Sequence, residues 1–171
     1  MIFLQRSEDG YRFEGSSAAV EDGTAWGVSY TIDVDDRWIT RSARVASRST
    51  EGEREVRLEA DGRGAWRVDG ERAPELAACL DVDLEASAFT NAFPVHRLGL
   101  RVGDRADAPA AYVRAHDVRV ERLEQHYTRV ADDGVRPRYD YAAPAFDFAA
   151  TLVYDELGLV LEYPGIAVRM A

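Results

Sequence analysis

Apolar and polar residues alternate with a period of two along much of the chain, a pattern typical of half-buried antiparallel strands. In Trp26–Val34, every second residue is aromatic or aliphatic. Asp35 and Asp36 then form a turn signal, and a second alternating run follows at Trp38–Ser49. The two runs and the turn between them predict a β-hairpin.

Similar short runs continue toward the C-terminus, separated by turn residues at roughly 8–12 positions, the spacing of a sandwich, barrel or roll. Further strands are expected at Arg54–Ala60, Ala65–Val68, Leu80–Leu84, Ala111–Arg114, Val118–Leu123, His126–Val130, Arg138–Tyr141, Phe146–Tyr154, Val160–Tyr163 and Ile166–Met170. On the simplest interpretation, Leu80–Leu84 points its leucines and valine inward. Asp81 and Asp83 would then face water.

Helical signals are few. Pro74–Ala78 allows a turn or two at most, and Asn91–Leu98 has the features of one short helix. Thr90 or Asn91 is a suitable N-cap, and Gly99 stands where a left-handed residue ends a helix. The chain of 171 residues is therefore expected to form a single, mainly antiparallel β domain with one short helix.

Composition narrows the functional classes. Hydrophobic residues make up 46% and charged residues 30%, as in ordinary globular proteins. The net charge of −10 repels phosphate backbones and anionic lipids, so nucleic acid is not an expected partner. All 21 basic residues are arginine, which suggests a GC-rich genome or a proteome adapted to high internal salt.

Several features favour a cytoplasmic protein without stable membrane insertion. The lone Cys79 can form neither an intrachain disulfide nor a CxxC metal pair, and it is expected to be a small buried apolar residue. Arg6, Glu8 and Asp9 interrupt the start of the chain, where a signal peptide would be apolar. No window approaches the roughly 18–20 apolar residues that span a bilayer.

Familiar catalytic and nucleotide-binding motifs are missing: the sequence contains no GxxxxGK[ST], no strand-linked GxGxxG, no HExxH and no GxSxG. His96, His116 and His126 are too far apart to show metal-ligand spacing. His126 is expected to be a solvated or hydrogen-bonded strand residue. No cofactor or metal is therefore expected.

Two groups of residues carry possible chemistry, each with an ordinary alternative. Asp81 and Asp83 lie on one face of a strand and suit acid–base work or a hard cation, but an acidic strand facing water is the favoured interpretation. The tyrosines and tryptophans concentrate on predicted strands with arginines nearby. They fit an aromatic-lined pocket and ordinary β-sheet packing equally well.

A specific combination of short motifs extends along most of the chain. Its elements are WRVDG at residues 66–70, CLDVDL at 79–84, FTN at 89–91, QxYxR at 125–129 and YPG at 163–165. With these motifs the chain resembles, over about residues 26–170, a family of small prokaryotic proteins described as glycolipid-binding.

The resemblance implies a spiral β-roll, in which an antiparallel sheet wraps around one short helix, often as a dimer. Asn91–Leu98 is the expected inner helix, with Pro74–Ala78 as the alternative. The fold is similar to that of bacterial lipoprotein carrier factors, whose open half-barrel holds acyl chains. The missing export signal departs from a carrier of the cell envelope.

The leading hypothesis is a non-enzymatic protein that binds a glycolipid or another amphipathic small molecule in an apolar interior. The residues expected to line the site or its mouth are Trp66, Arg67, Asn91, Arg97, Tyr127 and Tyr139. One alternative is a structural or interaction module, a homodimer formed through exposed β edges or apolar sheet faces. A less favoured alternative is an enzyme that uses Asp81, Asp83 and His96.

Overall fold

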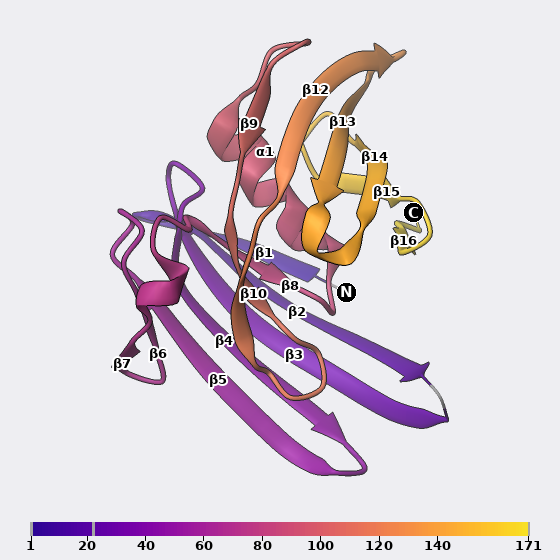
Figure 1. Cartoon of the computed structure of the whole chain (residues 1–171). Coiled ribbons are helices and arrows are strands. Elements are labelled where there is room, and N and C mark those ends of the chain that lie inside the picture. Colours follow the sequence, from indigo (N-terminus) through magenta and orange to yellow (C-terminus); the bar gives the residue numbers. More distant parts are fainter. Residues whose placement is uncertain (1, 22, 171) are drawn as a thin grey trace.

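A computed structural model describes residues 2–21 and 23–170, whose strands form three sheets (Figure 1). The first sheet is a meander of seven strands in chain order. Its strands are β1 (Ile2–Ser7), β2 (Gly10–Glu21), β3 (Thr24–Asp35), β4 (Thr40–Ser49), β5 (Gly52–Ala60), β6 (Trp66–Val68) and β7 (Glu71–Arg72).

The predicted hairpin is confirmed as β3 and β4, which pair antiparallel with Tyr30 opposite Val45. Alternate residues of β3 are buried from Trp26 to Val34, as the sequence pattern predicts. The Asp35 carboxylate stabilises the turn, because it accepts hydrogen bonds from the backbone N–H groups of Arg37 and Ile39.

The hairpin of β1 and β2 was not predicted. In β2, the stretch from Ser16 to Ala19 contains only small side chains, so the pattern shows no alternation of large apolar residues. The strand forms nevertheless because its entire length pairs with β3, from Gly10 opposite Asp35 to Glu21 opposite Thr24.

The other two sheets come from the second half of the chain. The second contains β8 (Asp81–Leu84), β10 (Ala110–Val113) and β11 (Val120–Leu123). The third contains β9 (Arg105–Asp107), β12 (His126–Asp133), β13 (Arg136–Ala143), β14 (Phe148–Tyr154), β15 (Val160–Tyr163) and β16 (Ala167–Val168). Strands β8 and β10 pair in parallel, whereas the other pairings described are antiparallel.

Four short helical segments connect the strands: η1 (Pro74–Leu76), η2 (Ala88–Asn91), α1 (Ala92–Leu98) and η3 (Pro144–Phe146). The α-helix lies where Asn91–Leu98 was predicted and ends at Gly99, whose φ of 54° is left-handed. The expected side-chain cap is wrong. Asn91 occupies the N-cap position of α1, but its side chain makes no capping hydrogen bond, because η2 runs directly into the helix and the Asn91 side chain bonds to Tyr127 instead.

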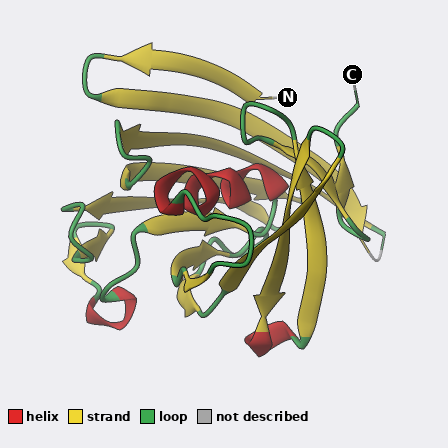
Figure 2. Ribbon diagram, turned by 90° about the horizontal axis from the view of Figure 1, so that it is seen from above, coloured by secondary structure: helices red, strands yellow, loops and turns green. Residues whose placement is uncertain are grey.

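Figure 2 shows α1 inside the curved strands, as the resemblance implied for Asn91–Leu98. Phe93 of α1 is fully buried and contacts Phe13 of β2, with 5.3 Å between ring centroids. Pro74–Ala78 supplies only the 3₁₀ turn η1. The fold is therefore a mainly β, antiparallel roll around one short helix, as expected.

Side chains fill the space around α1 as two clusters. We call the first the apolar core; its fully buried members include Phe13, Ile32, Leu58, Leu76 and Phe93. We call the second the tyrosine core; it contains Val95, Ala108, Tyr112, Leu123, Tyr127, Tyr139, Tyr141, Ala143, Leu152, Tyr154 and Tyr163. A ligand bound in the interior, as the sequence hypothesis requires, would need open space beside the helix. In the structure the side chains of the two cores pack beside the helix instead.

Candidate functional site

The two aspartates of β8 do not face water, which corrects the prediction from alternation. Asp81 is 1% exposed and Asp83 is 6% exposed. Both faces of β8 are covered, since Val82 and Leu84 belong to the apolar core while the aspartates lie on the opposite side, near α1 and the tyrosine core. An alternating pattern reports exposure only where one face of a strand is solvated.

Asp81 is held by a forked ion pair with Arg97 from the last turn of α1. The guanidinium Nε lies 3.1 Å from Asp81 Oδ1, and Nη2 lies 2.5 Å from Oδ2. Burial nevertheless raises the pKa of Asp81, although the guanidinium opposes that change. This ion pair fastens α1 to β8.

Asp83 has a different environment. Its Oδ1 accepts a hydrogen bond from Thr90 Oγ1 at 2.7 Å, and no ion pair to a basic side chain is among its described interactions. Burial raises the pKa of Asp83 to about 6, while the Thr90 hydroxyl opposes the rise.

Tyrosine side chains from five strands lie within electrostatic range of this carboxyl group. The Tyr127 hydroxyl donates to Asn91 Oδ1 at 2.7 Å, and the Tyr154 hydroxyl donates to the Asn91 carbonyl at 3.2 Å. Burial raises the pKa of both hydroxyls well above the ordinary value, so they remain donors. The tyrosines whose ionisation Asp83 opposes are Tyr112, Tyr127, Tyr141, Tyr154 and Tyr163.

Ser87 and the η2 segment that follows it together contact all three sheets. Thr90 bonds to Asp83 of the second sheet, and Asn91 bonds to tyrosines of the third. Just before η2, Ser87 Oγ lies 2.9 Å from the Tyr30 hydroxyl of the first sheet. This arrangement explains the FTN motif, in which the sequence identified Asn91 as a site residue but Thr90 only as a cap.

Tyr139 lies at the flank of this cluster. Its ring centroid is 5.2 Å from that of Tyr154, and Arg129 stacks over it with Cζ 5.1 Å from the centroid. Four of the six expected ligand residues are thus in or beside the tyrosine core: Asn91, Arg97, Tyr127 and Tyr139.

Trp66 and Arg67 belong to a different place. Trp66 is buried in the apolar core, and its indole N–H donates to the Cys79 carbonyl at 2.8 Å. Together with Arg67 it lines an open depression of about 810 Å³. The remaining lining residues are Glu59, Ala60, Asp61, Gly64, Ala65, Arg72, Ala73, Pro74 and Ala77. We call this space the Trp66 depression.

The three residues of the enzyme alternative do not contact one another in the described interactions. His96 stacks on Trp38, with ring centroids 3.6 Å apart, and its burial lowers its pKa. Asp81 pairs with Arg97, and Asp83 bonds to Thr90. Asp83 combines burial with a raised pKa, but it does not line any of the described depressions.

The predictions for His126 and Cys79 are confirmed. His126 is a hydrogen-bonded strand residue, with Nδ1 2.6 Å from Asp107 Oδ1. Cys79 is fully buried, which raises its pKa to about 11. Among the described residues, no group of three or more His, Cys, Asp or Glu is arranged to hold a metal ion.

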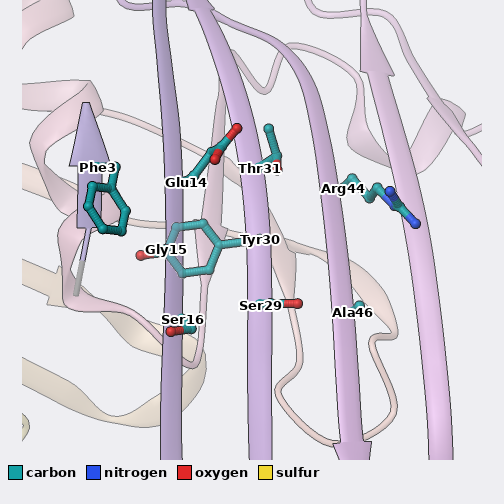
Figure 3. Close-up of a pocket in the computed structure, with 9 residues that line it drawn as sticks. All are labelled: Phe3, Glu14, Gly15, Ser16, Ser29, Tyr30, Thr31, Arg44 and Ala46. Atoms are coloured by element: carbon teal, nitrogen blue, oxygen red, sulfur yellow. The ribbon is translucent and has the colours of Figure 1, made fainter. Parts of the chain in front are cut away.

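A second depression lies over the seven-stranded sheet (Figure 3). Phe3, Glu14, Thr31 and Arg44 form one row across β1 to β4. The Tyr30 ring covers Gly15, and a Cβ atom on that glycine would lie 2.4 Å from the tyrosine Cζ. The glycine therefore gives Tyr30 the space it occupies.

The fold and its tyrosine core define a class of small open β-rolls around a short helix. The model of the family described as "Putative glycolipid-binding" matches residues 1–169, and the chain belongs to this family. The chain is also similar to a DUF1089 family protein from Pseudomonas aeruginosa of known crystal structure. The two share 35% sequence identity and a TM-score of 0.84, over 99% of this chain and 91% of that one.

No curated protein matches the chain. Within residues 2–21 and 23–170, no helix is long and apolar enough to cross a bilayer.

Proposed function

We propose that the protein binds an amphipathic small molecule of the glycolipid type and does not transform it chemically. The observation that carries this proposal is the Trp66 depression, in which apolar surface lies beside two arginines, Arg67 and Arg72, and two acidic residues, Glu59 and Asp61. Its volume of about 810 Å³ is within the usual range of small-molecule sites. The family description supports the same class of ligand.

The lining of the depression suits both parts of such a molecule. Ala60, Pro74 and Ala77 offer apolar surface to an acyl chain, whose burial contributes about 0.8 kcal/mol per methylene. Arg67 uses one of its N–H groups on the Gly70 carbonyl, at 2.8 Å, and has others left for hydroxyl or acidic groups of a headgroup.

The four expected ligand residues near α1 receive a different role in this proposal. Asn91, Arg97 and Tyr127 already use their polar atoms on partners inside the protein. Tyr139 is covered by Arg129. We assign Asn91 and Tyr127 to joining η2 to the third sheet, Arg97 to joining α1 to β8, and Tyr139 to packing within the third sheet. We assign ligand contact to Trp66 and Arg67.

Filling the depression tests the site. Ala77 is exposed within it, so Ala77→Trp should exclude an acyl chain without disturbing the core. Ala18→Trp, at an exposed position of β2, is the matched control. Two fluorescent probes measure binding: a single-chain glucosyl lipid and the same acyl chain without sugar. In addition, native mass spectrometry of protein purified from its own host detects a lipid that co-purifies.

We expect Ala77→Trp to reduce probe affinity at least about tenfold, as loss of two or more buried methylenes would. Ala18→Trp should bind like the wild type. The double variant Arg67→Gln/Arg72→Gln should reduce the affinity for the glucosyl lipid more than the affinity for the acyl chain without sugar. Failure of the wild type to bind either probe, with no lipid-sized mass in the native spectrum, would contradict the proposal.

The edge strand β1 favours a second function, association with another copy of the chain. All six residues of β1 are exposed, including Ile2, Phe3 and Leu4. As the first strand of its sheet, β1 presents unpaired backbone groups, which suit antiparallel pairing across a two-fold axis. Sedimentation should show a dimer that Leu4→Lys dissociates and Val20→Lys, on the neighbouring strand, does not; a monomeric wild type would contradict it.

The cytoplasm remains the proposed location, because a single buried thiol suits a reducing compartment.

A further inference from the structure

The hydroxyl of Thr90 is in contact with more hydrogen-bond acceptors than it can serve. Its Oγ1 lies 2.7 Å from Asp83 Oδ1 and 3.0 Å from the Ser87 carbonyl oxygen, and it accepts the Leu84 N–H at 3.2 Å. A hydroxyl has one hydrogen to donate. When Asp83 is ionised, its carboxylate and the Ser87 carbonyl compete for that hydrogen.

A proton on Asp83 removes the competition. The protonated carboxyl donates to Thr90 Oγ1, and Thr90 then donates to the Ser87 carbonyl while it still accepts from Leu84. Each of the three contacts then contains a hydrogen. When Asp83 is ionised, the Ser87 carbonyl keeps the Thr90 N–H at 3.5 Å as a described donor, so the shorter hydrogen bond from Thr90 Oγ1 is free to form only when Asp83 is protonated.

The groups that face Asp83 do not supply a compensating positive charge. Asp81 of the same strand is negative, and Arg97 of α1 is bound to Asp81. The titratable groups from the other packed strands are hydroxyls: Tyr112 from β10, Tyr127 from β12, Tyr141 from β13, Tyr154 from β14 and Tyr163 from β15. From η2 the contact is Thr90, which does not titrate.

We propose that Asp83 is a proton-linked latch that fastens η2 to β8 when it is protonated and loosens that attachment when it is ionised. Because η2 also bonds to the third sheet and follows the contact with Tyr30, the latch acts where the three sheets meet. The pKa of about 6, raised by burial, brings the change close to neutral pH.

The sign of the effect follows from the direction of the pKa change. The folded protein holds a proton on Asp83 over a range in which the unfolded chain, with an ordinary pKa near 3.8, has already lost it. Unfolding in that range releases a proton, so the contribution of Asp83 is greatest at low pH and declines as pH rises toward 6.

The experiment compares Asp83→Asn with the wild type by urea unfolding from pH 4 to pH 7, because the amide mimics the protonated carboxyl. The ratio of the unfolding constants, wild type over variant, should rise by up to about tenfold per pH unit between pH 4 and pH 6 and level off above pH 6, about fiftyfold to a hundredfold in total. Asp140→Asn is the matched control, since Asp140 also accepts a threonine hydroxyl, that of Thr151 at 2.7 Å, but is exposed. Its ratio should stay within about threefold.

A ratio for Asp83→Asn that is flat across this range would overturn the proposal. If that variant does not fold, the carboxyl ¹³C resonance of Asp83 in the wild type decides: a titration midpoint at or above about 5 supports the latch, and a lower midpoint overturns it. Amide exchange tests the attachment itself. Protection of the Leu84 amide should decrease from pH 5 to pH 7 beyond the intrinsic rate change, and constant protection would contradict the latch.

Discussion

The apolar core and the tyrosine core lie on either side of the same helix, yet different forces hold them together. Tyr30 is the one tyrosine among the buried members of the apolar core, whereas six tyrosines are buried in the other. Phe93 packs into the first and Val95 into the second, so α1 belongs to both. The apolar core depends on area and shape, which many side chains can supply.

The tyrosine core depends in addition on partners for its polar atoms. Each buried hydroxyl or carboxyl there needs a specific acceptor or donor, and an atom left without one destabilises the fold. The two cores should therefore respond differently: the first to loss of volume, the second to loss of a single atom at constant volume.

Removal of volume from the apolar core should have the largest effect. Phe93→Ala leaves a cavity beside Phe13 and Phe89, and we expect it to lower the free energy of unfolding by about 3–5 kcal/mol. Urea denaturation measures the change. Phe3→Ala, at a position 58% exposed on β1, should change stability by less than about 0.5 kcal/mol, and similar losses for both variants would contradict this description.

Breaking the ion pair beside the tyrosine core should cost nearly as much. Arg97→Met leaves Asp81 buried without its partner, and we expect it to lower the free energy of unfolding by about 3 kcal/mol near neutral pH. The pKa of Asp81 is already raised by burial and should rise further, so the cost should shrink as pH falls and the carboxyl is protonated. The double variant Arg97→Met/Asp81→Asn should recover most of the stability at neutral pH; no recovery would show that packing, not charge, causes the loss.

Loss of one oxygen atom tests the tyrosine core directly. Tyr127→Phe keeps the ring but leaves Asn91 Oδ1 without its short hydrogen bond, and we expect a loss of about 1–3 kcal/mol in the free energy of unfolding. Tyr30→Phe is the counterpart in the apolar core, where Ser87 Oγ loses its partner at an expected cost of about 1 kcal/mol. A negligible effect at Tyr127 would mean that both cores are held by area alone.

The same contrast explains which parts of the structure the sequence could predict. In β3 one face is buried, so alternation from Trp26 to Val34 correctly identifies the strand and its inner residues. In β8 both faces are buried, and the partners of Asp81 and Asp83 come from α1 and η2, later in the chain. The alternation of apolar and polar residues within the four residues of β8 does not indicate these partners.

The candidate site shows the same limit. Asn91 and Tyr127 belong to separate motifs, FTN and QxYxR, and the fold brings them within hydrogen-bond distance. Trp66 and Arg67 of the WRVDG motif lie instead at the Trp66 depression, because β6 belongs to the first sheet. Short motifs identify residues with specific roles; only the sheet order determines which of them meet.

The smallest expected effect comes from an exposed copy of the buried ion pair. Arg12 and Asp33 form the same forked contact on the seven-stranded sheet, with Nε 2.7 Å from Oδ1 and Nη2 3.1 Å from Oδ2, but the arginine side chain is 49% exposed. Water and salt screen such a pair, so Arg12→Gln should lower the free energy of unfolding by less than about 1 kcal/mol, and by still less in 1 M salt.

The dependence of the free energy of unfolding on pH also distinguishes the two ion pairs. The hydrogen bond from Arg12 lowers the pKa of Asp33, so the exposed pair stabilises the fold above about pH 4 and loses that contribution as pH falls. The cost of Arg97→Met also shrinks as pH falls, but it does so at a higher pH, because burial raises the pKa of Asp81. Urea unfolding at several pH values and two salt concentrations compares the variants. If Arg12→Gln were as costly and as insensitive to salt as Arg97→Met, the distinction between an exposed and a buried fork would fail, and the interior around Asp81 would have to be as well hydrated as the surface.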